Sequence, residues 1–145
     1  MRILIDADGC PVVELTLAVA AQFHSEVILF CDTAHALHWP GVPTVTVEKG
    51  PDSVDFALIN RLEAGDIVIT QDYGLAAMCL ARRGLPLNQN GLIYTAENID
   101  ALLAARHTAK KIRNAGGRLK GPAKREQKQD IAFERSLRRL LSGEG

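Results

Sequence analysis

The stretch Arg2-Ile3-Leu4-Ile5-Asp6-Ala7-Asp8-Gly9-Cys10-Pro11 begins the chain with a short apolar strand that leads directly into two carboxylates. In an open α/β sheet, ligands bind beyond the carboxyl ends of the strands. Asp6 and Asp8 stand two residues apart, so both side chains point to the same side of an extended segment. Such a pair is repulsive unless a hard cation such as Mg2+ or Mn2+ lies between the carboxylates. The structural alternative is that Asp8 caps the next helix and Asp6 closes a turn.

Strands and helices alternate along the rest of the chain. Hydrophobic periodicity predicts strands at 2–6, 26–31, 42–48 and 66–70, and helices at 11–24, 52–64, 73–83 and 99–114. We expect Pro11 in the first position of its helix and Asp52 as the cap of its own. Segments 85–87 and 92–94 flank the turn-forming residues 88–91. The alternation predicts a three-layer α/β fold, in which helices cover both faces of a mainly parallel sheet.

The chain of 145 residues, of which 47% are hydrophobic, is long enough for one domain with a substantial core. Residues 1–114 are expected to form the α/β domain, and residues 115–145 a basic loop and a C-terminal helix. An apolar stripe on that last helix is formed by Phe133, Leu137, Leu140 and Leu141. The stripe requires a surface to pack on, which is either the same domain or a partner subunit in a homodimer.

The formal net charge is zero, but the charges are unevenly distributed. Residues 1–105 hold 5 basic and 13 acidic side chains, whereas residues 106–145 hold 12 basic and 4 acidic ones. A basic arm on an acidic body is typical of proteins that bind a nucleic-acid backbone, although an arm folded onto the body explains it equally well. The candidate phosphate contacts in this arm are Arg118, Lys120, Lys124 and Arg125. Without interleaved aromatic residues, such binding should be salt-sensitive and weakly sequence-specific.

The sequence also disfavours several protein classes. No apolar run approaches the roughly 20 residues that span a bilayer, and the N-terminus lacks a signal-peptide pattern. Cys10, Cys31 and Cys79 are odd in number and lack metal-ligand spacing, so reduced thiols are expected. We therefore expect a cytoplasmic protein without a membrane association.

Acidic residues follow three of the predicted strands and open one predicted helix. They are Asp6, Asp8, Asp32 and Asp72 at strand ends, and Asp52 and Asp55 at the helix. Because the carboxyl ends of parallel strands share one edge, these carboxylates should converge into a Mg2+ or Mn2+ site. A carboxylate-bound metal activates water for phosphodiester hydrolysis, which requires no Ser, Cys or His nucleophile. Near these acids, Lys49, Asn88 and Asn90 are candidate substrate contacts, with ordinary loop and turn roles as the alternative.

Three segments, residues 3–8, 48–55 and 65–76, resemble the acidic motifs of PIN-like nuclease domains. The match is closer still to the bacterial YaiI/YqxD family, and it extends over residues 88–91 and 116–122 to nearly the whole chain. The resemblance implies a parallel sheet and a metal-dependent nuclease site, with RNA as the favoured substrate. The residues that correspond to the acidic ligands of PIN-like domains are Asp6, Asp52, Asp55 and Asp72.

This sequence departs from the PIN-like pattern after Asp72. Many PIN-like domains place another acid shortly afterwards, but Tyr73, Gly74 and Leu75 stand here. Asp8 either supplies the missing ligand or the ligand is absent, which favours one metal ion over two. We therefore take Asp6, Asp8 and Asp72 as the candidate catalytic residues and Asp52 and Asp55 as additional metal ligands.

The sequence is also compatible with two other functions. Residues 5–9 also resemble the first motif of haloacid-dehalogenase phosphotransferases, with Asp6 as the nucleophile and Asp8 as the acid/base. The later motifs of that superfamily match poorly, since Asp66 precedes its strand instead of following one. The third function is a non-catalytic module that binds RNA or a protein through the basic arm.

Overall fold

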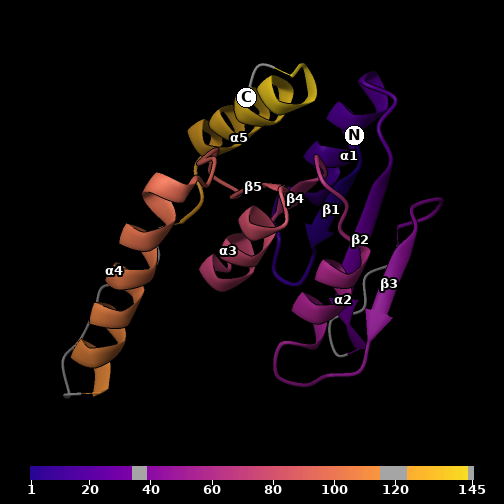
Figure 1. Ribbon diagram of the computed structural model, residues 1–145. Helices are drawn as coiled ribbons and strands as arrows, with labels where there is room; N and C mark the ends of the chain where they lie inside the picture. The colour runs from indigo at the N-terminus through magenta and orange to yellow at the C-terminus, as the bar shows by residue number, and fades with distance from the viewer. Residues whose placement is uncertain (34–38, 115–123, 144–145) are drawn as a thin grey trace.

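The computed structural model describes residues 1–33, 39–114 and 124–143. Within them, one five-stranded sheet is flanked by five helices (Figure 1). The elements, in chain order, are β1 (Ile3–Asp6), α1 (Val13–Gln22), β2 (Val27–Asp32), β3 (Thr44–Val47), α2 (Ser53–Arg61), β4 (Ile67–Ile69), α3 (Tyr73–Ala81), β5 (Leu85–Leu87), α4 (Ala96–Asn114) and α5 (Gln127–Leu141). The predicted three-layer α/β fold is confirmed.

The order of the strands identifies the edge at which a ligand site is expected. The strands lie in the order β3-β2-β1-β4-β5, and each neighbouring pair is parallel. The chain builds outward from β1 through β2 and β3, and then crosses back to place β4 on the other side of β1. The carboxyl ends of β1 and β4 therefore flank the point where the winding reverses, which is the usual ligand position in open α/β sheets.

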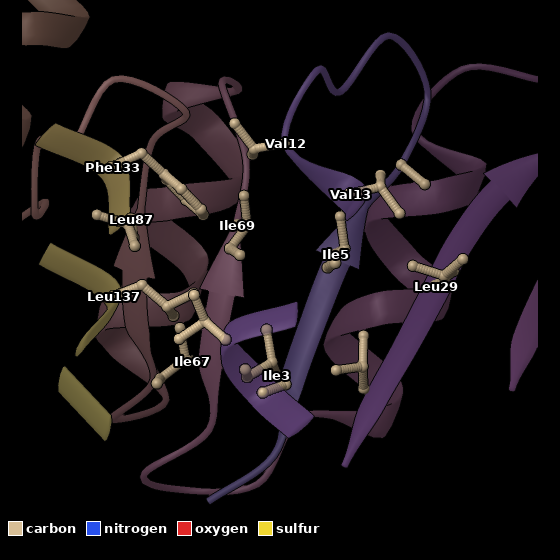
Figure 2. Close-up of a cluster of buried hydrophobic side chains, with 14 of the residues drawn as sticks. Ile3, Ile5, Val12, Val13, Leu29, Ile67, Ile69, Leu87, Phe133 and Leu137 are labelled. Atoms are coloured by element: carbon tan, nitrogen blue, oxygen red, sulfur yellow. The ribbon is translucent and has the colours of Figure 1, made fainter. Parts of the chain in front are cut away.

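The two faces of the sheet are covered by different helices, because successive strand residues point to opposite sides. Ile3 and Ile5 of β1 belong to a cluster with residues of α1 and α5, whereas Leu4 packs with residues of α2 and α3. Figure 2 shows the first cluster, in which Phe133 and Leu137 of α5 lie beside the side chains of β4 and β5. β1 is buried on both sides and so gives the site at its end a rigid base.

Helix α5 packs on its own chain. Phe133, Leu137 and Leu140 are buried against the sheet. At the periphery of this contact, Ser136 Oγ donates a hydrogen bond of 2.6 Å to the Gly91 carbonyl. The predicted apolar stripe is thus covered within the chain, and α5 requires no second subunit for its burial.

The starts of helices α1 and α2 differ from the prediction. α1 begins at Val13, so the placement of Pro11 in the first helical position was wrong. The reason is a turn after β1, in which Gly9 adopts a φ of 70° and the Cys10 N–H donates to the Ala7 carbonyl. Asp52 does precede α2, but it has a φ of 60° and its side chain makes no capping hydrogen bond. Val12, with no side-chain cap, precedes α1, so Asp8 does not cap that helix.

Helix α4 begins at Ala96, three residues before the predicted start. The sequence signal that was missed is the pair Thr95 and Asn98. The Asn98 N–H donates to Thr95 Oγ1 and the Thr95 N–H donates to Asn98 Oδ1, the reciprocal arrangement of a capping box. Among the described helices, α4 included, none is both long and apolar enough to cross a bilayer.

Gly91 fixes the loop of residues 88–91 against α5. Its φ is 92°, and a Cβ built on it would lie 2.6 Å from the Ala132 carbonyl oxygen. We expect Gly91→Ala to destabilise the protein by about 2–4 kcal/mol, through left-handed strain and overpacking. Gly65→Ala is the matched control, because its φ is 89° and a Cβ there meets nothing within 4 Å.

Urea unfolding of the two glycine variants separates the two contributions. Gly65→Ala should lose only about 1–2 kcal/mol, from backbone strain alone. Equal losses in the two variants would contradict the close approach of the 88–91 loop to α5.

Candidate metal and phosphate site

A cavity of about 420 Å³ lies at the carboxyl ends of β1 and β4. Three of the predicted acids, Asp6, Asp8 and Asp72, line it together with Thr70 and Arg106. The cavity thus occupies the point where the winding of the sheet reverses. The predicted convergence of carboxylates from separate parts of the sequence is observed for these three residues.

Thr70 connects the acids that follow β1 and β4. Its Oγ1 donates a hydrogen bond of 2.8 Å to Asp6 Oδ2, and it accepts one of 3.0 Å from the Asp72 N–H. Asp72 in turn caps α3, because its Oδ1 accepts from the N–H groups of Gly74 at 2.8 Å and Leu75 at 3.1 Å. Both carboxylates are therefore held in fixed orientations at the floor and rim of the cavity.

Asp8 is only partly satisfied by the protein. Its Oδ2 accepts a hydrogen bond of 3.1 Å from the Asp32 N–H, whereas Oδ1 is buried and has no hydrogen-bond partner among the described residues. The Oε1 atom of Gln89, which also lines the cavity, is in the same state. A buried acceptor without a partner costs on the order of 1–3 kcal/mol, so each of these two atoms would be stabilised by a donor or a cation.

The electrostatics of the site also favour a cation. The pKa of Asp6 is raised to about 6, chiefly by burial and to a lesser extent by repulsion from Asp72 and Asp8, whereas the hydrogen bond from Thr70 acts to lower it. Burial raises the pKa of Asp55 to about 6 as well, with contributions from Asp72, Asp6 and Asp52. These carboxylates repel one another, and a proton or a divalent cation relieves the repulsion.

The donor set fits a cation that needs few protein ligands. Within the described ranges, no three His, Cys, Asp or Glu side chains come together closely enough to hold a metal ion by themselves. Mg2+ retains several waters and is commonly bound through one or two carboxylates. Asp6, Asp8 and Asp72 line the cavity, and one or two of their carboxylates would be the protein ligands of such an ion.

The family model described as "Uncharacterized BCR, YaiI/YqxD family" matches residues 4–143. The chain belongs to the YaiI/YqxD family. A relative from Exiguobacterium sibiricum, named UPF0178 protein, is 55% identical over 142 residues, which cover 98% of this chain and 97% of the relative. A second UPF0178 protein, from Ruminiclostridium cellulolyticum, is 50% identical over 137 residues, which cover 94% of this chain and 90% of the relative. The resemblance to the family that the sequence motifs indicated is confirmed.

The remaining predicted metal ligands of this YaiI/YqxD protein lie beside the cavity and do not line it. Asp55 is half-buried on the first turn of α2 and is close enough to Asp6 and Asp72 to repel both. Asp52 is exposed at the N-terminus of the same helix. The backbone of Asp52 is left-handed, with a φ of 60°. Such strain at a non-glycine residue is often found at functional sites.

Three of the predicted substrate contacts make hydrogen bonds within the protein. Asn88 Oδ1 accepts hydrogen bonds from the N–H groups of Asn90 and Leu92. Asn88 therefore has the turn-forming role that is the alternative to a substrate contact. Arg125 donates through Nη1 to Asn90 Oδ1, through Nη2 to the Gln89 carbonyl and through Nε to Asp130 Oδ1. These contacts attach the 88–91 loop to the start of α5.

The other predicted substrate contacts do not line the cavity. Lys49 is exposed ahead of α2, and Lys124 is exposed ahead of α5. Arg118 and Lys120 lie outside the described residues.

The polar residues that line the cavity without having been predicted as site residues are Thr70, Gln71, Tyr73, Gln89 and Arg106. Gln71 and Tyr73 flank Asp72, so proximity to a strand-end acid could have identified them. Gln89 stands within the turn whose neighbouring asparagines were chosen instead. Arg106 carries no local signal, because it comes from α4 and reaches the cavity only through the packing of α4 on α3.

Proposed function

We propose that this protein is a metal-dependent nuclease that hydrolyses phosphodiester bonds, with RNA as the favoured substrate, at the cavity beyond β1 and β4. The observation that carries the proposal is the set of carboxylates at this position, in which Asp8 Oδ1 is buried without a partner among the described residues. The resemblance of its acidic motifs to those of PIN-like nuclease domains supports the same chemistry. A bound Mg2+ or Mn2+ would supply an acidified water and would neutralise charge on the phosphate.

The residues at and near the cavity would have different roles in such a site. Asp6 and Asp8 lie on the β1 side and Asp72 on the β4 side, and one or two of these carboxylates would hold a cation that keeps most of its waters. Thr70 holds the Asp6 carboxylate through its 2.8 Å hydrogen bond, which keeps one oxygen in place. Asp55 adds negative charge nearby, which strengthens the attraction for a cation.

The side chains around the cavity favour water over a protein nucleophile. Cys10 is the thiol that lines it, and burial raises the pKa of this group. A reactive cysteine requires a lowered pKa, because the thiolate is the nucleophile. Hydrolysis by an activated water therefore fits these residues better than attack by a cysteine.

Cleavage of labelled single-stranded RNA and single-stranded DNA by the purified protein tests the proposal. We expect metal-dependent cleavage in Mg2+ or Mn2+ that stops in EDTA, with RNA cleaved in preference to DNA. Either cation, Mg2+ or Mn2+, should also raise the thermal midpoint of the protein, because a ligand that binds only the folded state stabilises it.

Two outcomes would contradict the nuclease proposal. The first is a full absence of cleavage in protein whose thermal midpoint rises with Mg2+ or Mn2+. The second is a covalent aspartyl-phosphate formed on Asp6 from an aryl phosphate, which would indicate the phosphotransferase alternative.

A further inference from the structure

Arg106 is the cation that lines the acidic cavity in the described part of the chain. It comes from α4, which packs on α3, and its Nη1 lies 3.7 Å from Asp72 Oδ1 at the N-terminus of α3. The wall of the cavity therefore presents carboxylates on the sheet side and a guanidinium on the α4 side.

The ion pair between Arg106 and Asp72 contributes little to the stability of the protein. The two side chains are 59% and 41% exposed, and an exposed pair contributes about 0–1 kcal/mol. Asp72 Oδ1 already accepts two backbone N–H groups, which satisfy it as the cap of α3. Asp72 therefore does not require Arg106, and the guanidinium can exchange the carboxylate for another anion.

Other described basic residues near this edge of the sheet are engaged elsewhere or do not line the cavity. Arg125 uses Nε and both terminal nitrogens in contacts with Asp130, Gln89 and Asn90. Lys49 and Lys124 are exposed but do not line the cavity. A phosphodiester that approaches the carboxylates of the cavity meets repulsion, so an adjacent cation must offset part of it.

We infer that Arg106 binds a backbone phosphate of the nucleic acid next to the metal-binding acids. The planar guanidinium binds phosphate oxygens through two parallel N–H donors, which an ammonium cannot do. In the free protein the guanidinium lies 3.7 Å from Asp72, and in the complex it contacts the phosphate instead. The inference rests on the proposed function, because it assigns the substrate contact of the same cavity.

The test measures binding separately from cleavage. Anisotropy of a fluorescein-labelled single-stranded 12-mer RNA is followed in Ca2+ over a series of NaCl concentrations, with a gel to confirm that the RNA stays intact. Arg106→Gln should weaken binding by roughly 10-fold, since it removes a charge-assisted contact. The slope of log K against log [NaCl] should become shallower by about 0.7, the value for one lost phosphate contact on a single strand.

Two matched variants make the test specific. Arg106→Lys should recover the salt slope but only part of the affinity, because it keeps the charge and loses the bidentate geometry. Arg135→Gln removes an exposed arginine of α5 outside the cavity and should bind within about twofold of the wild type, since it leaves the cavity unchanged. All variants should keep the thermal midpoint of the wild type, because the Arg106 contact adds little stability.

The outcomes separate this inference from the nuclease proposal. Wild-type protein that cleaves RNA, together with Arg106→Gln protein that binds and cleaves it equally well, would overturn the role of Arg106 alone. Loss of binding in Arg106→Gln, in a protein that never cleaves with Mg2+ or Mn2+, would keep the role of Arg106 and overturn the nuclease. Absence of RNA binding by the wild type would overturn the inference.

Discussion

Replacing Asp6 with asparagine is expected to abolish metal-dependent cleavage and at the same time to stabilise the metal-free protein at pH 8. The asparagine side chain would keep the shape of the aspartate and an oxygen that accepts from Thr70, but it would lose the charge that attracts a cation. The loss in cleavage rate should be on the order of 100- to 1,000-fold, as for other groups that stabilise charge in a transition state. The gain in stability follows from the cost of burying the charged carboxylate, to which repulsion from Asp72 and Asp8 adds a smaller part.

The sign of the stability change comes from the raised pKa. The Asp6 carboxyl titrates with a pKa of about 6 in the folded protein, against 3.8 for the ordinary side chain. Between these values the folded protein keeps a proton that the unfolded chain has released, so stability falls as the pH rises from about 4 to about 6. The full difference corresponds to about 2–3 kcal/mol, and Asp6→Asn should recover about 1–3 kcal/mol of it above pH 6.

Urea unfolding in EDTA at pH 4.5 and pH 8, together with the RNA cleavage assay, measures both effects. Asp66→Asn is the matched control, because Asp66 is a buried carboxylate at the amino end of β4 that pairs with Arg2 at 2.8 Å. That substitution should destabilise the protein by about 1–3 kcal/mol at both pH values and leave cleavage nearly unchanged. An Asp6→Asn variant that is less stable than the wild type at pH 8 would contradict the conclusion that burial and nearby acids destabilise the charged Asp6 carboxylate.

The sequence was sufficient to predict those features that depend on local pattern and on parallel topology. Asp6 and Asp8 follow one apolar strand, and Asp72 follows another. In a parallel sheet the carboxyl ends of these strands lie at the same edge, so the three side chains are expected there. Arg106 could not be predicted in this way, because its position depends on how α4 packs on α3, which no local pattern specifies. The contacts of Arg125 depend on tertiary packing in the same way, since this residue attaches the 88–91 loop to α5.

The second large effect is expected in the core. Phe133 of α5 is fully buried among residues of the sheet and of α1 (Figure 2). Phe133→Ala should destabilise the protein by about 3–5 kcal/mol, because it leaves a cavity that a rigid sheet cannot fill. For a domain whose total stability is typically about 5–15 kcal/mol, this change brings the protein near to unfolding. Urea unfolding at pH 7 measures the loss.

Ile131→Ala on the same helix is the control, because Ile131 is 53% exposed and its truncation should cost no more than about 0.5 kcal/mol. Equal small losses in the two variants would contradict the packing of α5 on the sheet and would indicate that another surface covers its apolar stripe. The packing also matters for the cavity, because α5 and Arg125 hold the loop that presents Gln89. Phe133→Ala protein that remains folded at low temperature should therefore lose cleavage activity in proportion to the loosening of that loop, whereas Ile131→Ala protein should keep it.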